Sequence, residues 1–208
     1  REPGAPDLIR FWECSGYSVV LGVAQSIHEE VCVSTCRQDG IPVLRRCSAG
    51  GCVLQGPGCL NYSLGLNLEH HPELRGIRES YRHIMQQVSD ALCLLGTEGR
   101  LEPPSDLAVN GMKISGNAQK RRGQALLHHG TLLLGMDTRY MERYLREPVA
   151  RTRYRGSRKH GAFVSALGIR AEQLKTALSR VFGVAGPVLK PSSQWQEYAE
   201  KLVLTKYT

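Results

Sequence analysis

A lysine lies within residues 110–116, which read NGMKISG, and its neighbours could fix its position. Asn110 and Gly111 both tolerate a positive φ, so they suit the two-residue turn of a β-hairpin. The flanking segments DLAV and MKI have the composition of short strands. Lys113 would then project from the second strand of the hairpin. Taken alone, these seven residues also fit a surface hairpin with a solvated lysine.

Small residues follow this lysine, and they would let a ligand approach the main chain closely. They are Ser115, Gly116, Asn117 and Ala118. Backbone N–H groups that are exposed beside a lysine can bind a phosphate or a developing oxyanion. The segment is therefore a candidate site for chemistry on an anionic group.

A second candidate, RRCSAGGCV at residues 45–53, joins two arginines to a compact turn of small residues. Arginine donates to carboxylates and phosphates in a bidentate manner, and glycines allow backbone amides to reach the same ligand. The segment predicts an anion-binding loop. A plain glycine turn after an edge strand is the alternative that these residues leave open.

Histidines and further basic residues occur in two other segments. His128 and His129 lie in LLHHGTLLL, and adjacent residues of a strand point to opposite faces, so only one of them can face a given pocket. A paired metal site is therefore disfavoured, and a satisfied core or surface histidine is the alternative reading. The segment YRGSRKH at residues 154–160 is strongly basic and is a further candidate. A solvated basic loop is the alternative reading of this segment. No Walker-type phosphate loop, GxSxG elbow or HExxH pattern occurs in the sequence.

Composition limits the class of protein. The 208 residues are 41% hydrophobic and 22% charged, which fits one globular domain with a sizeable core. The formal net charge of +8 favours an acidic partner, which could be nucleic acid or an acidic protein surface, or else a solvated basic face. An aromatic content of 6% disfavours a nucleic-acid-binding module, so no nucleic-acid partner is expected.

Cysteine usage and hydropathy point to a cytoplasmic protein. The seven cysteines are odd in number and form no CxxC pair, which indicates free thiols and no protein-bound metal. No apolar run approaches the ~18 residues of a membrane span. No signal peptide is visible at the N-terminus. We therefore expect neither export nor a membrane partner.

An α+β fold is expected to position these segments, with helices on one face of a sheet. The expected strands are residues 8–13, 17–23, an antiparallel meander within 41–68, the hairpin at 106–114 and a strand at 124–135. The expected helices are residues 25–38, 72–95, 138–145, 171–181 and 192–207, with a loop at 96–105.

The order of the motifs resembles the lipoate–protein ligase A branch of the biotin/lipoate protein ligase family. From about residue 11 to residue 145 the matching motifs are VVLG followed by Gln25, then RRCSAGG, SDL at 105–107, KISGNAQ and HHGTLL. The combination of the arginine–glycine loop with the KxSGxA and HHG motifs is far more specific than either part. The resemblance implies a mixed, mostly antiparallel sheet backed by helices, with the carboxylic acid in a sheet-lined tunnel.

The resemblance also implies a reaction in two steps. Lipoate or octanoate reacts with ATP, whose phosphates carry Mg²⁺, to give the acyl-adenylate, and a lysine of an acceptor lipoyl domain then attacks it. The implied acceptor is the E2 subunit of a 2-oxoacid dehydrogenase, the glycine cleavage H protein or another lipoate-binding protein. Lys113 would be the catalytic residue in both steps. The implied substrate- and adenylate-binding residues are Arg46, Ser48, Ala49, Gly50, Gly51, Asp106, Ser115, Gly116, Ala118 and His129.

Some features depart from the family pattern. Ala49 stands in place of a glycine, Gln55 in place of a common histidine and Cys59 in place of a common asparagine. These departures bear on the ATP site. Relative to the family, residues 1–208 would form a single compact catalytic domain that is short at both ends and lacks the C-terminal accessory domain.

Two other functions remain open at this point. An octanoyltransferase of the same fold would carry the acyl group on a cysteine. The loop GTEGRLEPPSD has no cysteine where such relatives place theirs, whereas Cys47, Cys52 and Cys59 keep this reading open. A non-catalytic binding module is less favoured.

The basic residues 151–160 are expected to dock the acceptor. The resemblance implies that this acceptor is a small acidic domain, and opposite charge accelerates encounter and sets orientation. Arg155 and Arg158 are the docking residues that this hypothesis names.

Overall fold

A six-stranded antiparallel sheet forms the centre of the computed structural model, which describes residues 6–148, 151–188 and 197. Its order is β1–β5–β9–β8–β7–β6. The strands are β1 (Leu8–Glu13), β5 (Cys59–Asn67), β9 (Ala125–Leu133), β8 (Met112–Arg122), β7 (Asp106–Val109) and β6 (Arg100–Glu102). Because successive side chains of a strand alternate between faces, each strand serves two different layers.

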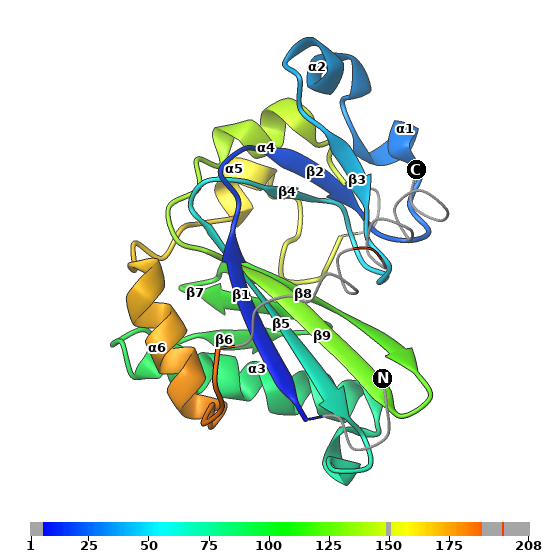
Figure 1. Ribbon diagram of the computed structural model, residues 1–208. Coiled ribbons are helices and arrows are strands. Elements are labelled where there is room, and N and C mark those ends of the chain that lie inside the picture. Colours follow the sequence, from blue (N-terminus) through cyan, green and yellow to red (C-terminus); the bar gives the residue numbers. More distant parts are fainter. Residues whose placement is uncertain (1–5, 149–150, 189–196, 198–208) are drawn as a thin grey trace.

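Two helices, α3 (Ile77–Cys93) and α6 (Ala171–Val181), cover one face of this sheet (Figure 1). Apolar residues of α3 recur at helical spacing and are buried, as at Ile84, Val88 and Leu92. They pack against inward side chains of the strands, among them Tyr62 and Leu107, in one core cluster. The short 3₁₀ helix η1 (Pro72–Leu74) leads into α3. This layer makes the sheet a rigid support for residues on its other face.

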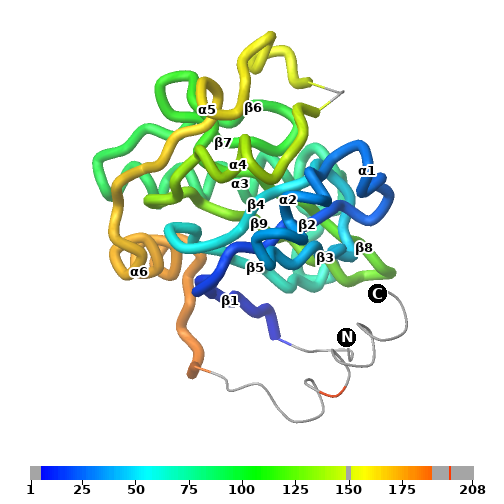
Figure 2. Tube along the Cα trace, turned by 90° about the horizontal axis from the view of Figure 1, so that it is seen from above, coloured from blue at the N-terminus to red at the C-terminus, as the bar shows by residue number. Residues whose placement is uncertain are grey.

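A three-stranded sheet lies over that other face, with strand order β3–β2–β4 (Figures 1 and 2). Its strands are β2 (Ser18–Leu21), β3 (Val43–Arg45) and β4 (Val53–Gln55). The short helices around it are α1 (Ile27–Glu30), α2 (Val33–Gln38), α4 (Arg139–Tyr144) and α5 (His160–Phe163). A second core cluster joins this layer to the end of β9. The space between the two sheets is where the sequence motifs meet.

The expected α+β class, with a mostly antiparallel sheet backed by helices, is confirmed. The hairpin that carries the lysine is also confirmed, with φ of 50° at Asn110 and 73° at Gly111. Strand β8, however, does not stop after the MKI segment but continues to Arg122. Its pairing with β7 shifts register between Leu107 and Ala108, as at a β-bulge.

Three expectations about the fold are wrong. The single helix at residues 25–38 is divided into α1 and α2, because the buried Val31 forms a β-bridge with Leu145 instead of a helical turn. The meander is replaced by pairing across the chain: β3 runs parallel to β2, β4 antiparallel to β2, and β5 joins the large sheet. The loop at 96–105 contains strand β6.

The remaining helices agree with the expected positions where the structure describes them. Residues 138–145 and 171–181 contain α4 and α6, and residues 72–95 contain η1 and α3. The helix expected at residues 192–207 lies outside the described residues, apart from residue 197. Within the described part of the chain, no helix has both the length and the apolar character needed to cross a membrane.

Candidate active site

Lys113 is held by a carboxylate on the neighbouring strand. Its Nζ lies 2.7 Å from Oδ1 of Asp106, and the two side chains are 27% and 9% exposed. Asp106 begins β7 and pairs with Gly116 of β8. The other oxygen, Oδ2, accepts a hydrogen bond of 2.7 Å from the hydroxyl of Tyr154. The ammonium is thus fixed in place and still accessible from the space between the sheets.

Gly116 provides the room that this arrangement needs. A Cβ atom at this position would lie 3.2 Å from Nζ and 3.3 Å from Cε of Lys113. Gly116 also pairs with Thr131 of β9, so it sits in the floor of the site. The lysine side chain therefore lies flat over a residue that has no side chain.

The arginine–glycine loop is organised by Arg46. Its Nη2 donates to the carbonyls of Ala49 and Gly51, each at 2.8 Å, and Nη1 donates to that of Val20 at 3.2 Å. Its Nε donates to Oγ of Ser48 at 3.1 Å. Burial lowers the pKa of this guanidinium from its ordinary value. Arg46 was expected to bind the adenylate at its acyl phosphate together with the backbone of residues 48–51, and here its donors shape that backbone loop.

Arg45 performs a similar role for the loop that follows β2. Its Nη1 donates to the carbonyls of Gly22 and Gln25, each at 2.8 Å. The Gln25 side chain in turn accepts from the N–H of Gly22 at 2.8 Å. A Cβ on Gly22 would lie 2.1 Å from the carbonyl oxygen of Gly50, so only glycine allows the two loops to meet. The two adjacent arginines therefore fix two loops against each other.

His129 joins the glycine loop to the large sheet. Its Nε2 lies 2.6 Å from Oγ of Ser48, a fully buried residue. Burial, and then the charge of Arg46, lowers the pKa of His129 to about 4, so the ring is neutral near pH 7. Because Arg46 donates to that Oγ, the serine hydroxyl hydrogen is free to donate to the neutral ring. His128 points the opposite way, toward Tyr62 in the helix-side core, as expected for neighbours on a strand.

A row of polar side chains to which the sequence analysis assigned no role crosses the same face. Thr131 donates from Oγ1 to Oδ1 of the fully buried Asn61 at 2.7 Å. Gln55, from the small sheet, donates to Oγ1 of Thr131 at 3.3 Å. Gln55 is one of the departures from the family pattern, and it still connects the two sheets. The one signal available in the sequence was the strand position of Thr131 beside the HHG motif.

Most of the expected binding residues gather around the space between the sheets. Ala118 pairs with His129 in register and therefore lies on the same face. Ser115 does not: its Oγ accepts from Asn117, which is bonded to Tyr62 on the helix side. Strand alternation turns the Ser115 side chain into the core, so the expected contact of Ser115 with the adenylate would have to come from its backbone.

Two of the cysteines near this region, Cys52 and Cys59, have largely buried thiols. Burial raises the pKa of Cys52 to about 12 and that of Cys59 to about 11. Cys59 packs with its sulfur 3.6 Å from that of Met136. Cys47 is partly exposed beside Ser48. All seven cysteines are free, and no cluster of three or more His, Cys, Asp or Glu side chains in the described residues is placed to hold a metal.

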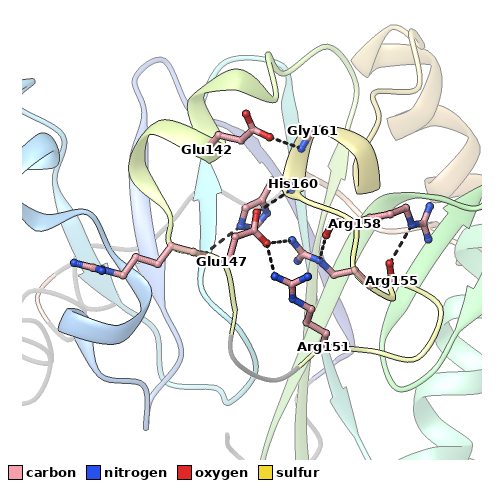
Figure 3. Close-up of polar contacts among 8 residues, drawn as sticks. Glu142, Glu147, Arg151, Arg155, Arg158, His160 and Gly161 are labelled. Carbon is pink, nitrogen blue, oxygen red and sulfur yellow. Dashed lines mark hydrogen bonds and ion pairs between the residues drawn. The ribbon is translucent and has the colours of Figure 1, made fainter.

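The basic segment does not present Arg155 to solvent. Arg155 is buried, and its Nη2 pairs with Oε2 of Glu147 at 2.8 Å (Figure 3). Arg158 donates to the carbonyls of Gly111, at 2.9 Å, and Tyr154. The expectation that Arg155 docks the acceptor is corrected here, because its side chain is buried and paired with Glu147, whereas Arg158 is partly exposed and its docking role stays a prediction.

Known proteins share this fold. A bipartite lipoate protein ligase of Thermoplasma acidophilum, solved together with its E2 lipoyl domain, matches with a TM-score of 0.84 and 23% identity, over 98% of this chain and 82% of that one. A lipoate-protein ligase A bound with ATP matches with a TM-score of 0.82 and 23% identity, over 98% and 83%. At this level of identity the similarity concerns the fold.

Sequence relatives include both a ligase and a transferase. Lipoate-protein ligase LplJ of Bacillus subtilis is 34% identical over 116 residues, covering 56% of this chain and 34% of the relative. Octanoyltransferase LipM of Carboxydothermus hydrogenoformans is 36% identical over 180 residues, covering 76% and 66%. The chain spans 44%, 66% and 34% of the lengths of three curated relatives that it matches.

A match over residues 1–182 to the description "Lipoyl protein ligase A/B catalytic domain" spans most of the chain and every part of the site described above. The chain belongs to the lipoyl protein ligase A/B family.

Proposed function

We propose that the protein is an ATP-dependent lipoate–protein ligase that acts through an acyl-adenylate. The observation that carries this proposal is the Lys113 ammonium, fixed 2.7 Å from Asp106 on the sheet face that also holds His129 and faces the glycine loop. A fixed cation in a partly buried site stabilises oxygens that gain negative charge during a reaction. Acyl activation and acyl transfer both develop such charge.

The chemistry divides into two balanced steps. In the first, a carboxylate oxygen of lipoate attacks the α-phosphorus of ATP, and pyrophosphate leaves. In the second, the neutral amine of an acceptor lysine attacks the carbonyl carbon, AMP leaves with the bonding electron pair, and the amine loses a proton to form the amide. Lys113 would offset charge on the phosphoryl oxygens in the first step and on the carbonyl oxygen in the second.

The residues present fit a nucleotide phosphate. The backbone of residues 48–51 is shaped by Arg46 and exposed from Ala49 to Gly51, so its N–H groups can meet an anion together with Lys113. Mg²⁺ would arrive bound to the phosphates of ATP and supply charge neutralisation there. We propose that Gly116, Ala118 and His129 line the same site, and Asp106 acts on it through Lys113.

The alternative function is an octanoyltransferase, which the similarity to LipM favours. It requires a thiolate that accepts the octanoyl group from a carrier-protein thioester. Cys52 and Cys59 are poorly suited, since burial raises the pKa of each well above neutrality. Cys47, partly exposed beside Ser48, is the thiol that this alternative would use.

One pair of assays separates the two functions. The ligase predicts ATP–pyrophosphate exchange that depends on lipoate or octanoate, and lipoylation of an acceptor domain that stops without ATP. The transferase predicts acyl transfer from octanoyl carrier protein without ATP, with a thioester visible by intact mass and lost in Cys47→Ser. The second pattern would overturn the ligase assignment.

The proposed macromolecular partner is a lipoyl domain that presents its target lysine. Part of the structural support is a relative solved with an E2 lipoyl domain, although that similarity concerns the fold. We further propose that residues 1–208 act as one catalytic domain in the cytoplasm. Lipoylation of a purified lipoyl domain by this chain alone would test directly whether residues 1–208 act as one catalytic domain on that partner.

A further inference from the structure

We propose that Tyr154 is a positioning residue that fixes the Lys113 ammonium through Asp106, and that the basic segment around it, residues 151–164, is an internal brace. The inference rests on the proposed function of Lys113. The two carboxylate oxygens of Asp106 have different partners: Oδ1 pairs with Lys113 and Oδ2 accepts a hydrogen bond from the Tyr154 hydroxyl, each at 2.7 Å. A carboxylate held at both oxygens cannot turn, so the lysine it pairs with keeps one position.

Tyr154 is itself fixed to the hairpin that carries the lysine. Arg158 donates from Nη2 to the carbonyl of Tyr154 and from Nη1 to that of Gly111, at 2.9 Å for the second bond. Gly111 lies in the turn between β7 and β8, two residues before Lys113. The Arg158 guanidinium therefore connects Tyr154 to the hairpin that carries Lys113.

Arg155 attaches the brace to Glu147, which precedes the brace in the sequence. Its Nη2 pairs with Oε2 of Glu147 at 2.8 Å, and its Nε donates to the carbonyl of Arg158 at 3.0 Å (Figure 3). Oε1 of the same glutamate accepts from the N–H of His160 at 3.2 Å. Glu147 thus holds both ends of a short loop, and burial of Arg155 shields the pair from solvent.

Phe163 fills the interior of this loop. The guanidiniums of Arg155 and Arg158 lie 4.8 Å and 5.1 Å from the centre of its ring. The ring of Tyr154 lies 5.0 Å from it, so the aromatic part of Tyr154 is packed independently of its hydroxyl. Removing only the hydroxyl should therefore leave the packing intact.

The brace also reaches the main chain of the lysine. Lys113 forms a β-bridge with Val164, and the N–H of Ser165 donates to the Lys113 carbonyl at 3.0 Å. Burial, and then the charge of Asp106, raises the pKa of Tyr154, so its hydroxyl remains a donor throughout the neutral range. The main chain of Lys113 is thus held directly by the end of this segment, and its side chain is held indirectly, through Asp106 and Tyr154.

The test replaces Tyr154 with Phe, and Tyr144→Phe is its matched control. Tyr144 also donates from its hydroxyl to an aspartate, Asp39, at 3.0 Å, but on another side of the molecule. Both variants lose one Tyr–Asp hydrogen bond, so their melting temperatures should fall to a similar extent. Tyr154→Phe alone should lower kcat about tenfold for exchange and for transfer, with little change in KM for lipoate.

A double-mutant cycle with Asp106→Asn distinguishes positioning from general destabilisation. If Tyr154 acts through Asp106, then Tyr154→Phe should have almost no further effect on kcat in the Asp106→Asn background. Arg158→Lys replaces the two separate nitrogens that reach the carbonyls of Gly111 and Tyr154 by one ammonium, so it should lower the same kcat severalfold. Wild-type kcat in Tyr154→Phe, an equal loss in Tyr144→Phe, or a full tenfold loss in both backgrounds would each overturn the inference.

The wild-type assays keep this result separate from the proposed function. If wild type shows no exchange but transfers octanoyl groups without ATP, the ligase assignment fails. The same cycle is then measured on that transfer, because Lys113 would still stabilise the acyl oxygen there. The role of Tyr154 is decided in either case.

Discussion

Lys113 and Asp106 lie on adjacent strands with 2.7 Å between Nζ and Oδ1, so the cation proposed for catalysis is held by a carboxylate that is 9% exposed while its own side chain stays 27% exposed. A free lysine samples many rotamers, and fixing it in advance removes that entropy from the reaction. The Asp106 carboxylate also partly neutralises the charge of the Lys113 ammonium. The arrangement therefore favours a fixed position of the ammonium over the strongest possible electric field.

The first prediction concerns Lys113→Met, which keeps the apolar stem and removes the charge. Lipoate-dependent exchange and transfer from supplied lipoyl-adenylate should each fall at least ~100-fold, the scale for loss of a fixed donor. Lys120→Met, at an exposed position of the same strand, is the control. Unchanged transfer from the supplied adenylate would limit Lys113 to the first step.

The second prediction concerns Gly116→Ala. The new Cβ would lie 3.2 Å from Nζ of Lys113, and because that atom ends a flexible side chain, the ammonium should move and not the backbone. Exchange should fall about tenfold with a change in melting temperature of only a few degrees. Gly135→Ala, whose Cβ meets no other atom, is the control. An active Gly116→Ala protein would show that the lysine does not need this room.

Local signals explain how much of the fold could be predicted. The hairpin at Asn110-Gly111 was predictable because two residues determine such a turn, and α3 because its apolar residues recur over several turns. The parallel pairing of β2 with β3 was not, since no short segment records which distant strand it joins. The division of helix 25–38 has the same origin, because Leu145 competes for the backbone of Val31.

The site shows the same limit. Lys113, Gly116 and His129 belong to motifs whose order identifies the family, so their neighbourhood could be anticipated. Tyr154 could not, because its contact with Asp106 joins residues 48 positions apart and no motif marks the hydroxyl. Composition alone also misled for Arg155: a run of basic residues reads as solvated, whereas Glu147 and Phe163 bury this one.

The third prediction is a dependence of stability on pH. The pKa of His129 is lowered to about 4 and that of His128 to about 3, chiefly by burial, whereas the unfolded chain titrates near the ordinary 6.5. Below that value the unfolded state binds more protons, so the free energy of unfolding should decrease as the pH falls from 6.5 toward 4. The slope is about 1.4 kcal/mol per pH unit for each histidine that stays neutral in the fold.

Urea unfolding at several pH values measures this slope. His129→Gln keeps an acceptor for Ser48 but does not titrate, so it should remove about one proton from the difference between the two states. Identical slopes for wild type and His129→Gln would show that His129 is protonated in the folded protein.

The last prediction moves acceptor docking to exposed residues of the basic segment. Reversing Arg155 and Arg158 would break the contacts with Glu147 and Gly111, so a loss of activity would not report on docking. Arg153 and Lys159 are exposed in the same segment. If they attract an acidic acceptor, changing both to Glu should raise KM for the acceptor severalfold, reduce the salt dependence of transfer and spare pyrophosphate exchange.

The control is a second double variant with the same change in net charge on another face of the protein. Arg78 and Arg82 are exposed on α3, which covers the opposite face of the large sheet. Their replacement by Glu should leave KM for the acceptor near its original value, because the effect of charge falls off within a Debye length of roughly 8 Å at physiological salt. Equal effects of the two double variants would indicate attraction by the whole protein, and a parallel loss of exchange in the Arg153 and Lys159 variant would assign these residues to the brace.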